Sequence, residues 1–359
     1  MKQLDLFFEE NRKQITHDIF QAYYDARRNK RKTINALAFE KHLEAYLFQL
    51  IDEISTYNYE IQRSICFIVN KPVKREIFAA DFRDRVVHHF LYNHIAPLYE
   101  NVFIEDSYSC RINKGTHYGI KRINQFIKEC SKNYTQDCYV LKLDIKGYFM
   151  AMNKDILHNK VKSLLLRNKA DLNFDLNIAL YLLEKVIFND PRINCKIKGS
   201  KSDWKGLPPS KTMFHSKENC GLPIGNLTSQ LFGNVYLNEF DHWIKNELNI
   251  QYYGRYVDDF VLIHPDKEYL KSLIPKISNF LHSNLQLTLH PNKIYLQHYT
   301  KGVQFLGAKI KPYRIYIGNR TKGNFYDTIQ EHNKIVNERK PSEDEIKACL
   351  PQARRSKAV

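Results

Sequence analysis

Two adjacent acidic residues, Asp258 and Asp259, stand inside an otherwise apolar stretch of this sequence. The stretch runs Arg255-Tyr-Val-Asp-Asp-Phe-Val-Leu-Ile-His264, and no lysine or arginine follows the acidic pair within it. Partly buried carboxylates are costly unless a cation accompanies them, and hard divalent ions prefer oxygen ligands. Two interpretations are therefore open: a divalent-metal site at a turn between strands, or an ordinary solvated Asp-Asp turn.

A third acidic residue, Asp144, ends a stretch that alternates in the manner of a β-strand. In Tyr139-Val-Leu-Lys-Leu-Asp-Ile-Lys-Gly-Tyr-Phe149 the alternation stops at Asp144, and a turn containing glycine follows. One interpretation is a cap for the next helix. The other joins Asp144 to Asp258 and Asp259 as ligands of two metal ions, an arrangement that catalyses in-line phosphoryl transfer.

The composition favours a polyanionic partner. The 359 residues include 55 Lys and Arg against 39 Asp and Glu, a formal net charge of +16, together with 23 Tyr and 21 Phe. Basic side chains release counterions from a phosphate backbone and aromatic rings stack on bases, so nucleic acid fits this composition. Solvated lysines on a basic protein are the alternative, and the basic run at 27–32 has the same two interpretations.

Length and apolar content predict a large core divided into two or three lobes, since 43% of the residues are hydrophobic. No apolar run is long enough to cross a bilayer, and the start of the chain lacks a signal-peptide pattern. We therefore expect a cytoplasmic protein with no membrane partner. The seven cysteines are odd in number and form no Cys-x-x-Cys motif, which favours reduced thiols without zinc.

Three motifs, in this order and spacing, resemble the palm domain of reverse transcriptases. They are Asp144-Ile-Lys-Gly-Tyr-Phe149, Gly221-Leu-Pro-Ile-Gly-Asn-Leu-Thr-Ser-Gln230 and Tyr256-Val-Asp-Asp259. Flanking motifs extend the resemblance to about residues 60–310. The segments at 82–89 and 107–115 resemble finger motifs of the group II intron branch, and Phe305-Leu306-Gly307 resembles the primer grip. An ordered set of this kind is more specific than any single motif.

One segment indicates a branch within that family. Most reverse transcriptases carry Gln-Gly and then Ser-Pro in the loop that contacts the incoming nucleotide, whereas this chain has Ile224-Gly225 and Ser229-Gln230. This string, and the preceding insertion at about 189–220, are similar to reverse transcriptases of diversity-generating retroelements, which are encoded by bacteria or phages. The resemblance implies an RNA-directed DNA polymerase that copies a template RNA into error-prone complementary DNA from a primer and deoxynucleotides, assisted by a small basic accessory protein.

Two alternatives stay open at this point. The chain is also compatible with a reverse transcriptase of another bacterial lineage, either retron-like or active in phage defence. A catalytically silent nucleic-acid-binding protein that has kept the palm fold is the third interpretation, and the intact set of three acidic residues argues against it.

The resemblance also implies catalytic roles for individual residues. Asp144, Asp258 and Asp259 are expected to hold two Mg²⁺ ions, which Mn²⁺ can replace, and Lys293 is expected to protonate the pyrophosphate leaving group. Arg111 and Lys114 match the finger motif whose cations bind the triphosphate of the incoming nucleotide. Taken without the motif, these two residues are ordinary solvated cations.

Three further residues are implied in nucleotide selection. Phe149 matches the steric gate that excludes a 2′-hydroxyl and so implies deoxynucleotides. Packing of Phe149 in the core is the alternative, and its neighbour Tyr148 could be the packed residue instead. Gly225 allows close approach of the backbone to the nucleotide. Ile224 replaces a hydrogen-bonding Gln, which loosens the check on pairing geometry, unless Ile224 merely packs.

The expected fold is α+β, a right-hand polymerase with fingers, an antiparallel-sheet palm and a short helical thumb. We expect strands at about 138–144, 252–264, 294–299 and 303–318, and helices near 155–167 and 229–248. The second helix is expected to be continuous and to pack through a stripe of residues four apart: Phe232, Tyr236, Phe240, Ile244 and Leu248. The expected domains are a helical basic N-terminal extension at 1–60, fingers at 61–137, a palm at 138–312 that contains the insertion, and a short thumb and tail at 313–359.

Overall fold

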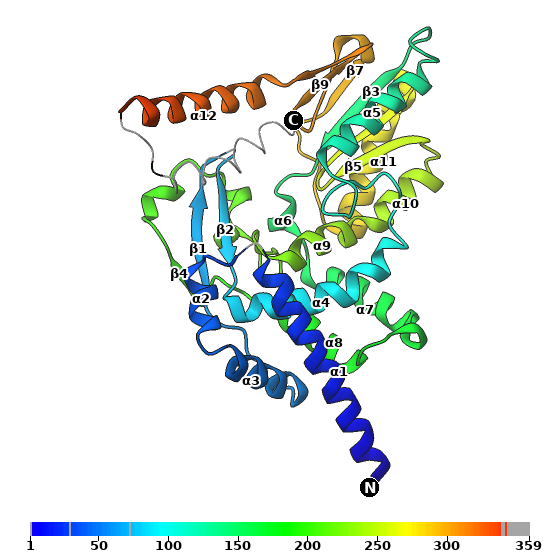
Figure 1. Cartoon of the computed structure of the whole chain (residues 1–359). Coiled ribbons are helices and arrows are strands. Elements are labelled where there is room, and N and C mark those ends of the chain that lie inside the picture. Colours follow the sequence, from blue (N-terminus) through cyan, green and yellow to red (C-terminus); the bar gives the residue numbers. More distant parts are fainter. Residues whose placement is uncertain (1, 29, 72, 339–341, 343–359) are drawn as a thin grey trace. The chain divides into compact units, whose positions relative to one another are not determined.

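The computed structural model describes residues 2–28, 30–71, 73–338 and 342 (Figure 1). The chain forms two compact units, and each is assembled from separate stretches of sequence. Unit 1 comprises residues 1–104, 145–243 and 277–289, and unit 2 comprises residues 105–144, 244–276 and 290–359. The expected assignment of fingers, palm and thumb is a division by function, and it stays a prediction.

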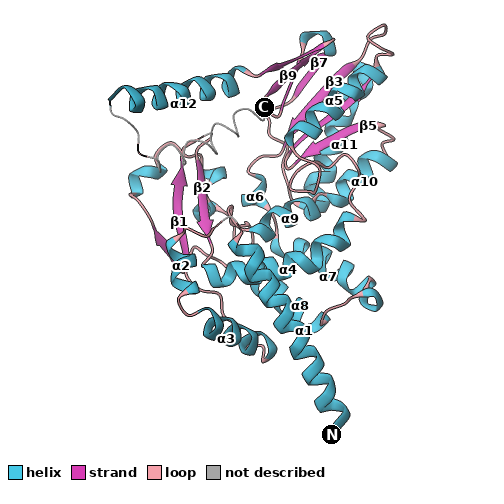
Figure 2. Ribbon diagram, in the orientation of Figure 1, coloured by secondary structure: helices cyan, strands magenta, loops and turns pink. Residues whose placement is uncertain are grey.

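Unit 1 is mainly helical (Figure 2). Side-chain caps fix the start of two of its helices: the Asp81 carboxylate accepts a hydrogen bond from Arg83 N, and the Asp175 carboxylate accepts from Asn177 N and Ile178 N. Such caps satisfy amides that have no partner within the helix. The helices of this unit are α1 (Lys2–Arg27), α2 (Ile34–Glu40), α3 (Leu43–Ser55), α4 (Phe82–Glu100), α6 (Tyr148–Ala151), α7 (Lys154–Arg167), α8 (Leu176–Phe188) and α9 (Leu227–Tyr236).

A small mixed sheet in unit 1 has the strand order β2-β1-β4. β1 (Ser64–Val69) pairs antiparallel with β2 (Arg75–Ala79) and parallel with β4 (Cys195–Ile197). β4 lies in the segment expected as an insertion. The buried Glu76 of β2 binds three later residues of that segment. Its carboxylate accepts hydrogen bonds of 2.6 Å from Trp204 Nε1, Thr212 Oγ1 and Met213 N.

Unit 2 contains an antiparallel sheet with the order β5-β6-β3-β7. Its strands are β3 (Tyr139–Asp144), β5 (Tyr252–Tyr256), β6 (Asp259–His264) and β7 (Tyr295–His298). Helix α5 (Thr116–Cys130) covers one face through an apolar stripe that includes Ile120, Ile123 and Ile127. This stripe belongs to one core cluster with Val140 of β3 and Val261 of β6, as the 3.6-residue period of the helix and the alternation of the strands require.

A second antiparallel sheet of unit 2 has the order β10-β9-β8. It consists of β8 (Val303–Phe305), β9 (Ala308–Lys311) and β10 (Arg314–Ile317), and α12 (Asn319–Glu338) follows. Helices α10 (Asn238–Asn246) and α11 (Lys267–Leu285) contain residues of both units. Short 3₁₀ helices lie at Lys169–Asp171, Lys201–Trp204, Pro209–Lys211, Met213–His215 and Tyr299–Lys301.

The α+β class is confirmed, and so are the helix near 155–167 and the hairpin at 252–264. The continuous helix expected at 229–248 is wrong, because the chain breaks at Leu237 between α9 and α10. Residues four apart advance by about 400° around a helix, so a stripe of five such residues drifts by about 160° and cannot face one partner. The break keeps the first four residues of the stripe buried, whereas Leu248 lies beyond α10 and is half-buried.

Two further expectations concern the remaining strands and the thiols. The region 303–318 forms three strands separated by tight turns, and 294–299 forms β7 followed by a 3₁₀ turn. Six of the seven cysteines lie among the described residues and form no disulfide, and Cys349 lies outside them. None of the helices among the described residues combines the length and apolar character needed to cross a membrane.

Candidate active site

The β5–β6 hairpin of unit 2 places the acidic pair at its tip. A two-residue turn, Val257-Asp258, joins the strands, and Asp259 is the first residue of β6. Val257 has a φ of +58°, which is rare for a β-branched residue and costs about 1–3 kcal/mol. The fully buried Arg255 offsets this strain, because its Nη1 donates to Val257 O at 2.9 Å and its Nη2 to Ser107 Oγ at 3.3 Å.

Strand register brings the third acidic residue beside this hairpin. β3 and β6 pair antiparallel, and Asp144 is the direct partner of Asp259. Direct partners in an antiparallel pair lie on the same face with Cβ atoms about 4.5–5.5 Å apart, where two like charges repel each other. The two carboxylates therefore require cations nearby.

Two lysines supply positive charge to these carboxylates. Lys293 Nζ lies 2.9 Å from both Oδ1 and Oδ2 of Asp144, and Lys142 Nζ lies 3.0 Å from Oδ2 of Asp259. Lys142 precedes Asp144 by two residues on β3, so both side chains leave the same face of the sheet. The segment that carries Lys293 is aligned by a 2.8 Å hydrogen bond from His290 N to Asp144 O.

Negative charge nevertheless remains in excess. Burial raises the pKa of Asp258 to about 6, and the charges of Asp144 and Asp259 add to this rise. The pKa of Asp259 is also raised by burial, against the opposing effect of Lys142. Oδ1 of Asp259 is buried and accepts no hydrogen bond from any described residue. Three carboxylates at this face thus share two lysines, and charge compensation is incomplete.

The side chains at this site are of the chemical type that binds a hard cation, but they are not arranged around one common metal position. Their donor atoms are carboxylate oxygens only, the kind that Mg²⁺ and Mn²⁺ bind. As placed among the described residues, no three Asp, Glu, His or Cys side chains stand together in a way that holds a metal ion. In this arrangement Lys293 contacts both oxygens of Asp144, and Lys142 contacts one oxygen of Asp259.

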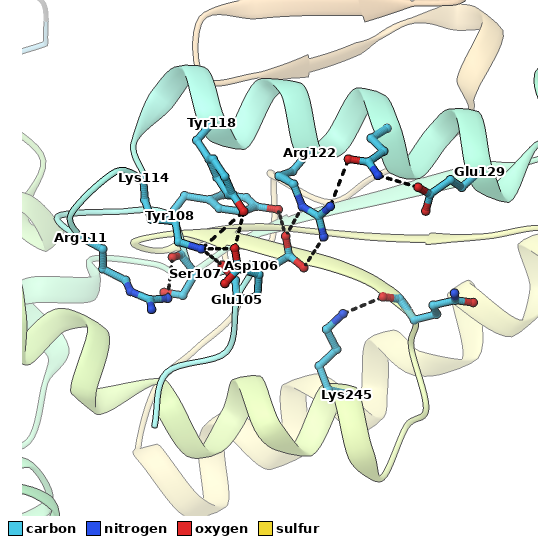
Figure 3. A network of polar contacts seen from close by, with 12 residues as sticks. Glu105, Asp106, Ser107, Tyr108, Arg111, Lys114, Tyr118, Arg122, Glu129 and Lys245 are labelled. Atoms are coloured by element: carbon cyan, nitrogen blue, oxygen red, sulfur yellow. Dashed lines mark hydrogen bonds and ion pairs between the residues drawn. The ribbon is translucent and has the colours of Figure 1, made fainter. Parts of the chain in front are cut away.

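The two cations expected to bind the triphosphate differ in their surroundings (Figure 3). Lys114 Nζ is paired with the Glu105 carboxylate, donates to Glu105 O at 2.8 Å and lies 4.5 Å from the centre of the Tyr118 ring. Arg111 Nη1 donates to Ser107 O at 3.1 Å. The charge of Lys114 is thus neutralised within the protein, and its expected role in triphosphate binding requires release from Glu105.

An ion pair between Arg122 of α5 and Asp106 holds the start of the loop that carries Arg111 and Lys114 (Figure 3). Arg122 Nε and Nη2 donate to the two oxygens of the buried Asp106 at 2.7 and 3.0 Å, a bidentate geometry. The Tyr108 hydroxyl also donates to Asp106 Oδ1, at 3.2 Å. Tyr108 N and Arg255 N each bond the opposite segment, to Arg255 O and Asp106 O, both at 2.9 Å. The loop is thereby tied to the same buried arginine that braces the acidic hairpin.

The three expected primer-grip residues form the turn between β8 and β9. Phe305 is buried at the end of β8, and Leu306 and Gly307 both have positive φ values, +49° and +83°. A two-residue hairpin with both residues in this region is a type I′ turn, whose twist matches that of the strands. Lys142 Nζ lies 6.0 Å from the centre of the Phe305 ring. This contact links the turn to the acidic face of the β5-β6-β3-β7 sheet.

Phe149 and Tyr148 have different roles within unit 1. Tyr148 is buried and its hydroxyl donates to Gly233 O in α9, whereas Phe149 is half-buried with its ring against the backbone of Gly233. Tyr148 is therefore the packed aromatic residue of the pair. Phe149 keeps an accessible part, as a residue that contacts a substrate must.

Ile224 and Gly225 lie beside β2 in unit 1. Ile224 O accepts a 2.9 Å hydrogen bond from Phe78 N, and its half-buried side chain packs against the apolar cluster that Phe149 also contacts. Gly225 has a φ of +127°, and a Cβ there would lie 2.9 Å from Ile77 Cγ2. The turn therefore requires glycine, and the loop around Ile224 is held by its backbone.

Comparison with known proteins decides the family. The family described as reverse transcriptase (RNA-dependent DNA polymerase) matches residues 70–310 of the chain. This protein belongs to the reverse transcriptase family. The expected assignment to RNA-directed DNA polymerases is thereby confirmed, whereas the match does not distinguish branches of the family.

Two curated relatives and one solved structure are similar to this reverse transcriptase. Protein YkfC of Escherichia coli K12 is 24% identical over 311 residues, which cover 77% of this chain and 74% of YkfC. A putative COX1/OXI3 intron 2 protein of Saccharomyces cerevisiae is 24% identical over 352 residues, or 86% of this chain and 39% of that protein. Apo telomerase from Candida tropicalis, truncated from its C-terminal domain, matches with a TM-score of 0.51 at 14% identity, over 72% of this chain and 55% of that one. The telomerase likeness shows the fold alone.

Sequence reasoning missed two residues of the reverse transcriptase site. Lys142 could have been found, because strand alternation places it on the same face as Asp144. Arg255 begins the acidic stretch and bonds Val257 two residues away, yet its hydrogen bond to Ser107 depends on a segment far away in the sequence. Only the folded chain shows that Arg255 braces the acidic hairpin and joins it to Ser107.

Proposed function

We propose that this reverse transcriptase copies the template RNA of a diversity-generating retroelement into error-prone complementary DNA in a bacterial cytoplasm. The observation that carries the proposal is the environment of Ile224. Its side chain has no hydrogen-bonding group and packs on an apolar cluster, and its carbonyl already accepts a hydrogen bond from Phe78 N. A pocket without a hydrogen-bonding group discriminates weakly between partners that differ in polar contacts.

The acidic face of unit 2 supports the chemistry. We assign Asp144, Asp258 and Asp259 as holders of two Mg²⁺ ions, for which Mn²⁺ can substitute. The Oδ1 atom of Asp259, which has no hydrogen-bond partner among the described residues, and the excess negative charge support this fit. Bound there, the ions would lower the pKa of the attacking hydroxyl and stabilise the charge on the transferred phosphate. Lys293, already adjacent to Asp144, is assigned as the proton donor to the leaving pyrophosphate.

The remaining assignments concern the substrates. Phe149 is assigned as the residue that excludes ribonucleotides, and Gly225 as the point of close backbone approach to the nucleotide. Arg111 and Lys114 are assigned to the triphosphate, with Glu105 as the group that Lys114 leaves. A template RNA, a primer, deoxynucleotides and a small basic accessory protein complete the proposed set of partners. The net charge of +16 and the many tyrosines support the nucleic-acid partners.

One experiment separates this function from its alternatives. Purified protein is given one RNA of equal base composition, a DNA primer and deoxynucleotides, with and without the accessory protein, and the complementary DNA is sequenced. We expect misincorporation concentrated opposite template adenines. An even error spectrum would assign the chain to another lineage, retron-like or defensive, and no extension under any condition would mark a silent nucleic-acid-binding protein. The Asp258→Asn variant is the matched negative control.

A further inference from the structure

A groove of about 590 Å³ lies in unit 2, built by elements with no assigned role in the proposed reaction. Helix α5 contributes two residues, the loop after it contributes two, the turn before β10 contributes one and β10 itself contributes two. The lining residues are Asn124, Lys128, Asn133, Tyr134, Tyr313, Arg314 and Ile315. The volume is in the range of a small-ligand site. The lining residues supply aromatic, cationic and carboxamide groups, and none of them is acidic.

A ladder of three tyrosine rings ends in this groove. Tyr299 is buried, and its ring stacks on that of Tyr134 with a centroid distance of 5.9 Å and an interplanar angle of 25°. Tyr134 then meets Tyr313 edge to face at 4.7 Å. Tyr313 is 82% exposed. The buried ring of Tyr299 holds Tyr134 in place, and Tyr313 at the end of the ladder offers an aromatic surface on which a planar base can stack.

The two cations of the groove are Lys128 and Arg314. Neither of them forms an ion pair with any residue that the structure describes. In contrast, Lys114 and Arg122 in the network of Figure 3 are both paired with carboxylates. Cations without a counter-ion beside an aromatic surface attract a phosphate, and the release of its counterions favours binding.

Several carbonyl groups at the end of helix α5 already have hydrogen-bond donors. Its last carbonyl groups already accept hydrogen bonds from the following turn: Ser131 N and Oγ donate to Ile127 O, and Asn133 N donates to Lys128 O at 2.8 Å. The negative end of the helix dipole is thereby partly satisfied. The carboxamides of Asn124 and Asn133 add donors and acceptors suited to the edge of a base.

We propose that this groove binds an unpaired nucleotide of a single-stranded RNA, with its base on Tyr313 and its phosphate between Lys128 and Arg314. The proposal is independent of the retroelement assignment, because it uses none of the residues assigned to catalysis or nucleotide selection. It gives the reverse transcriptase a second contact with its RNA, outside the residues assigned to polymerisation.

A fluorescent reporter tests the contact in the full-length protein. Tyr313→Trp keeps an aromatic ring at the stacking position, and Tyr316→Trp places the same reporter on an exposed tyrosine of β10 outside the groove. On titration with a short unstructured RNA we expect quenching of the fluorescence in the Tyr313→Trp protein and little change in the Tyr316→Trp protein. Equal responses of the two reporters would overturn the proposal.

Affinity variants test the two halves of the contact. Tyr313→Asn removes the ring but tolerates the observed φ of +62°, and we expect it to weaken RNA binding about tenfold, the value of one stacked base. Lys128→Gln with Arg314→Gln should reduce the salt slope of binding by about 1.4, since each single-strand phosphate contact contributes about 0.7. Lys301→Gln, which changes an exposed lysine outside the groove, is the matched control. Unchanged affinity and slope in the groove variants would exclude the site.

Three ligands show whether the groove binds RNA, DNA or a free nucleotide. Single-stranded RNA, single-stranded DNA and free nucleoside monophosphates are titrated against the Tyr313→Trp reporter, with primer extension on a short template as the activity measurement. We expect RNA to quench at the lowest concentration and extension to be unchanged in every groove variant. Quenching by free nucleotide at concentrations equal to those of RNA would assign a small-molecule site and refute the polynucleotide proposal. Preference for DNA would refute the RNA assignment.

Discussion

The acidic face of unit 2 and the Ile224 loop of unit 1 solve different physical problems. On the acidic face, strand register sets like charges opposite each other and lysines compensate them: Asp144 is the partner of Asp259, and Lys293 and Lys142 hold one each. In the Ile224 loop, the side chain packs on an apolar cluster and the backbone bonds to Phe78. The first region is positioned by pairing and electrostatics, the second by packing.

This difference predicts how each region responds to mutation. Removing a carboxylate from the acidic face should have a large effect on the reaction, because the proposed metal ions would lose a ligand. Removing a lysine should cost stability, because a half-buried carboxylate would then lack its cation. A change in the apolar loop should have a small effect, because an apolar pocket contributes only modest discrimination. The variants below test this contrast, from the largest expected effect to the smallest.

The largest effect is expected for Asp258→Asn, which removes one charge and leaves the shape of the hairpin unchanged. Primer extension should fall by at least about a thousandfold, since metal-assisted charge stabilisation supplies several kcal/mol to phosphoryl transfer. Asp266→Asn is the control: Asp266 caps α11 through its carboxylate, and Asn caps equally well. Rates are compared beside thermal melts. A variant that extends primers normally would show that Asp258 is an ordinary turn residue.

The second effect concerns the lysine that sequence reasoning missed. Lys142→Met keeps the aliphatic stem but leaves the half-buried Asp259 carboxylate without its cation, and we expect a loss of about 1–3 kcal/mol in the free energy of unfolding. Adding Asp259→Asn to this variant should recover most of the loss, because no charge then remains to be compensated. Denaturant unfolding of the single and double variants gives the coupling energy. A coupling energy near zero would contradict the ion pair.

Phe149→Ala tests the packed region with an intermediate effect. The ring lies half-buried against Gly233, whereas the adjacent Tyr148 carries the packing. Discrimination between deoxynucleotides and ribonucleotides should fall by about 10–100-fold, within the range of a single steric contact. Single-nucleotide addition measures the ratio. If the ratio is unchanged and the melting temperature drops, Phe149 is a core residue, the alternative that the sequence left open.

The sequence predicted much of the acidic region because its determinants are local. Alternation of apolar residues marks β3, and a continuous apolar run marks β6. Asp144, Asp258 and Asp259 stand where β3 ends and where the chain turns into β6. Antiparallel pairing of such strands then brings their ends together. The same alternation also contained the position of Lys142, although its partner depends on the register between β3 and β6.

Other features were not predictable in the same way, because they depend on the path of a loop, on the length of a helical repeat or on contacts between distant segments. The pairing of Lys114 with Glu105 requires the path of the loop that contains both residues. A four-residue repeat drifts around a helix, which the sequence shows only when the helical period is applied to its full length, and the chain breaks at Leu237. The division into two units joins stretches that lie far apart in the chain.

The smallest effect is expected for Ile224→Gln, and it carries the most information on function. The loop is held by its backbone hydrogen bond to Phe78 and by the positive φ of Gly225, so the substitution should change the side chain without moving the loop. At the proposed nucleotide contact, a polar side chain would restore one hydrogen bond, and fidelity should rise by up to about tenfold, the value of one modest hydrogen bond. Ile224→Leu, which stays apolar, should leave the error spectrum unchanged. Complementary DNA made from one RNA by all three proteins is sequenced with the accessory protein present. If the parent and Ile224→Gln produce the same errors, the side chain at this position has no part in fidelity. The acidic face and the Ile224 loop would then differ only in how the fold stabilises them.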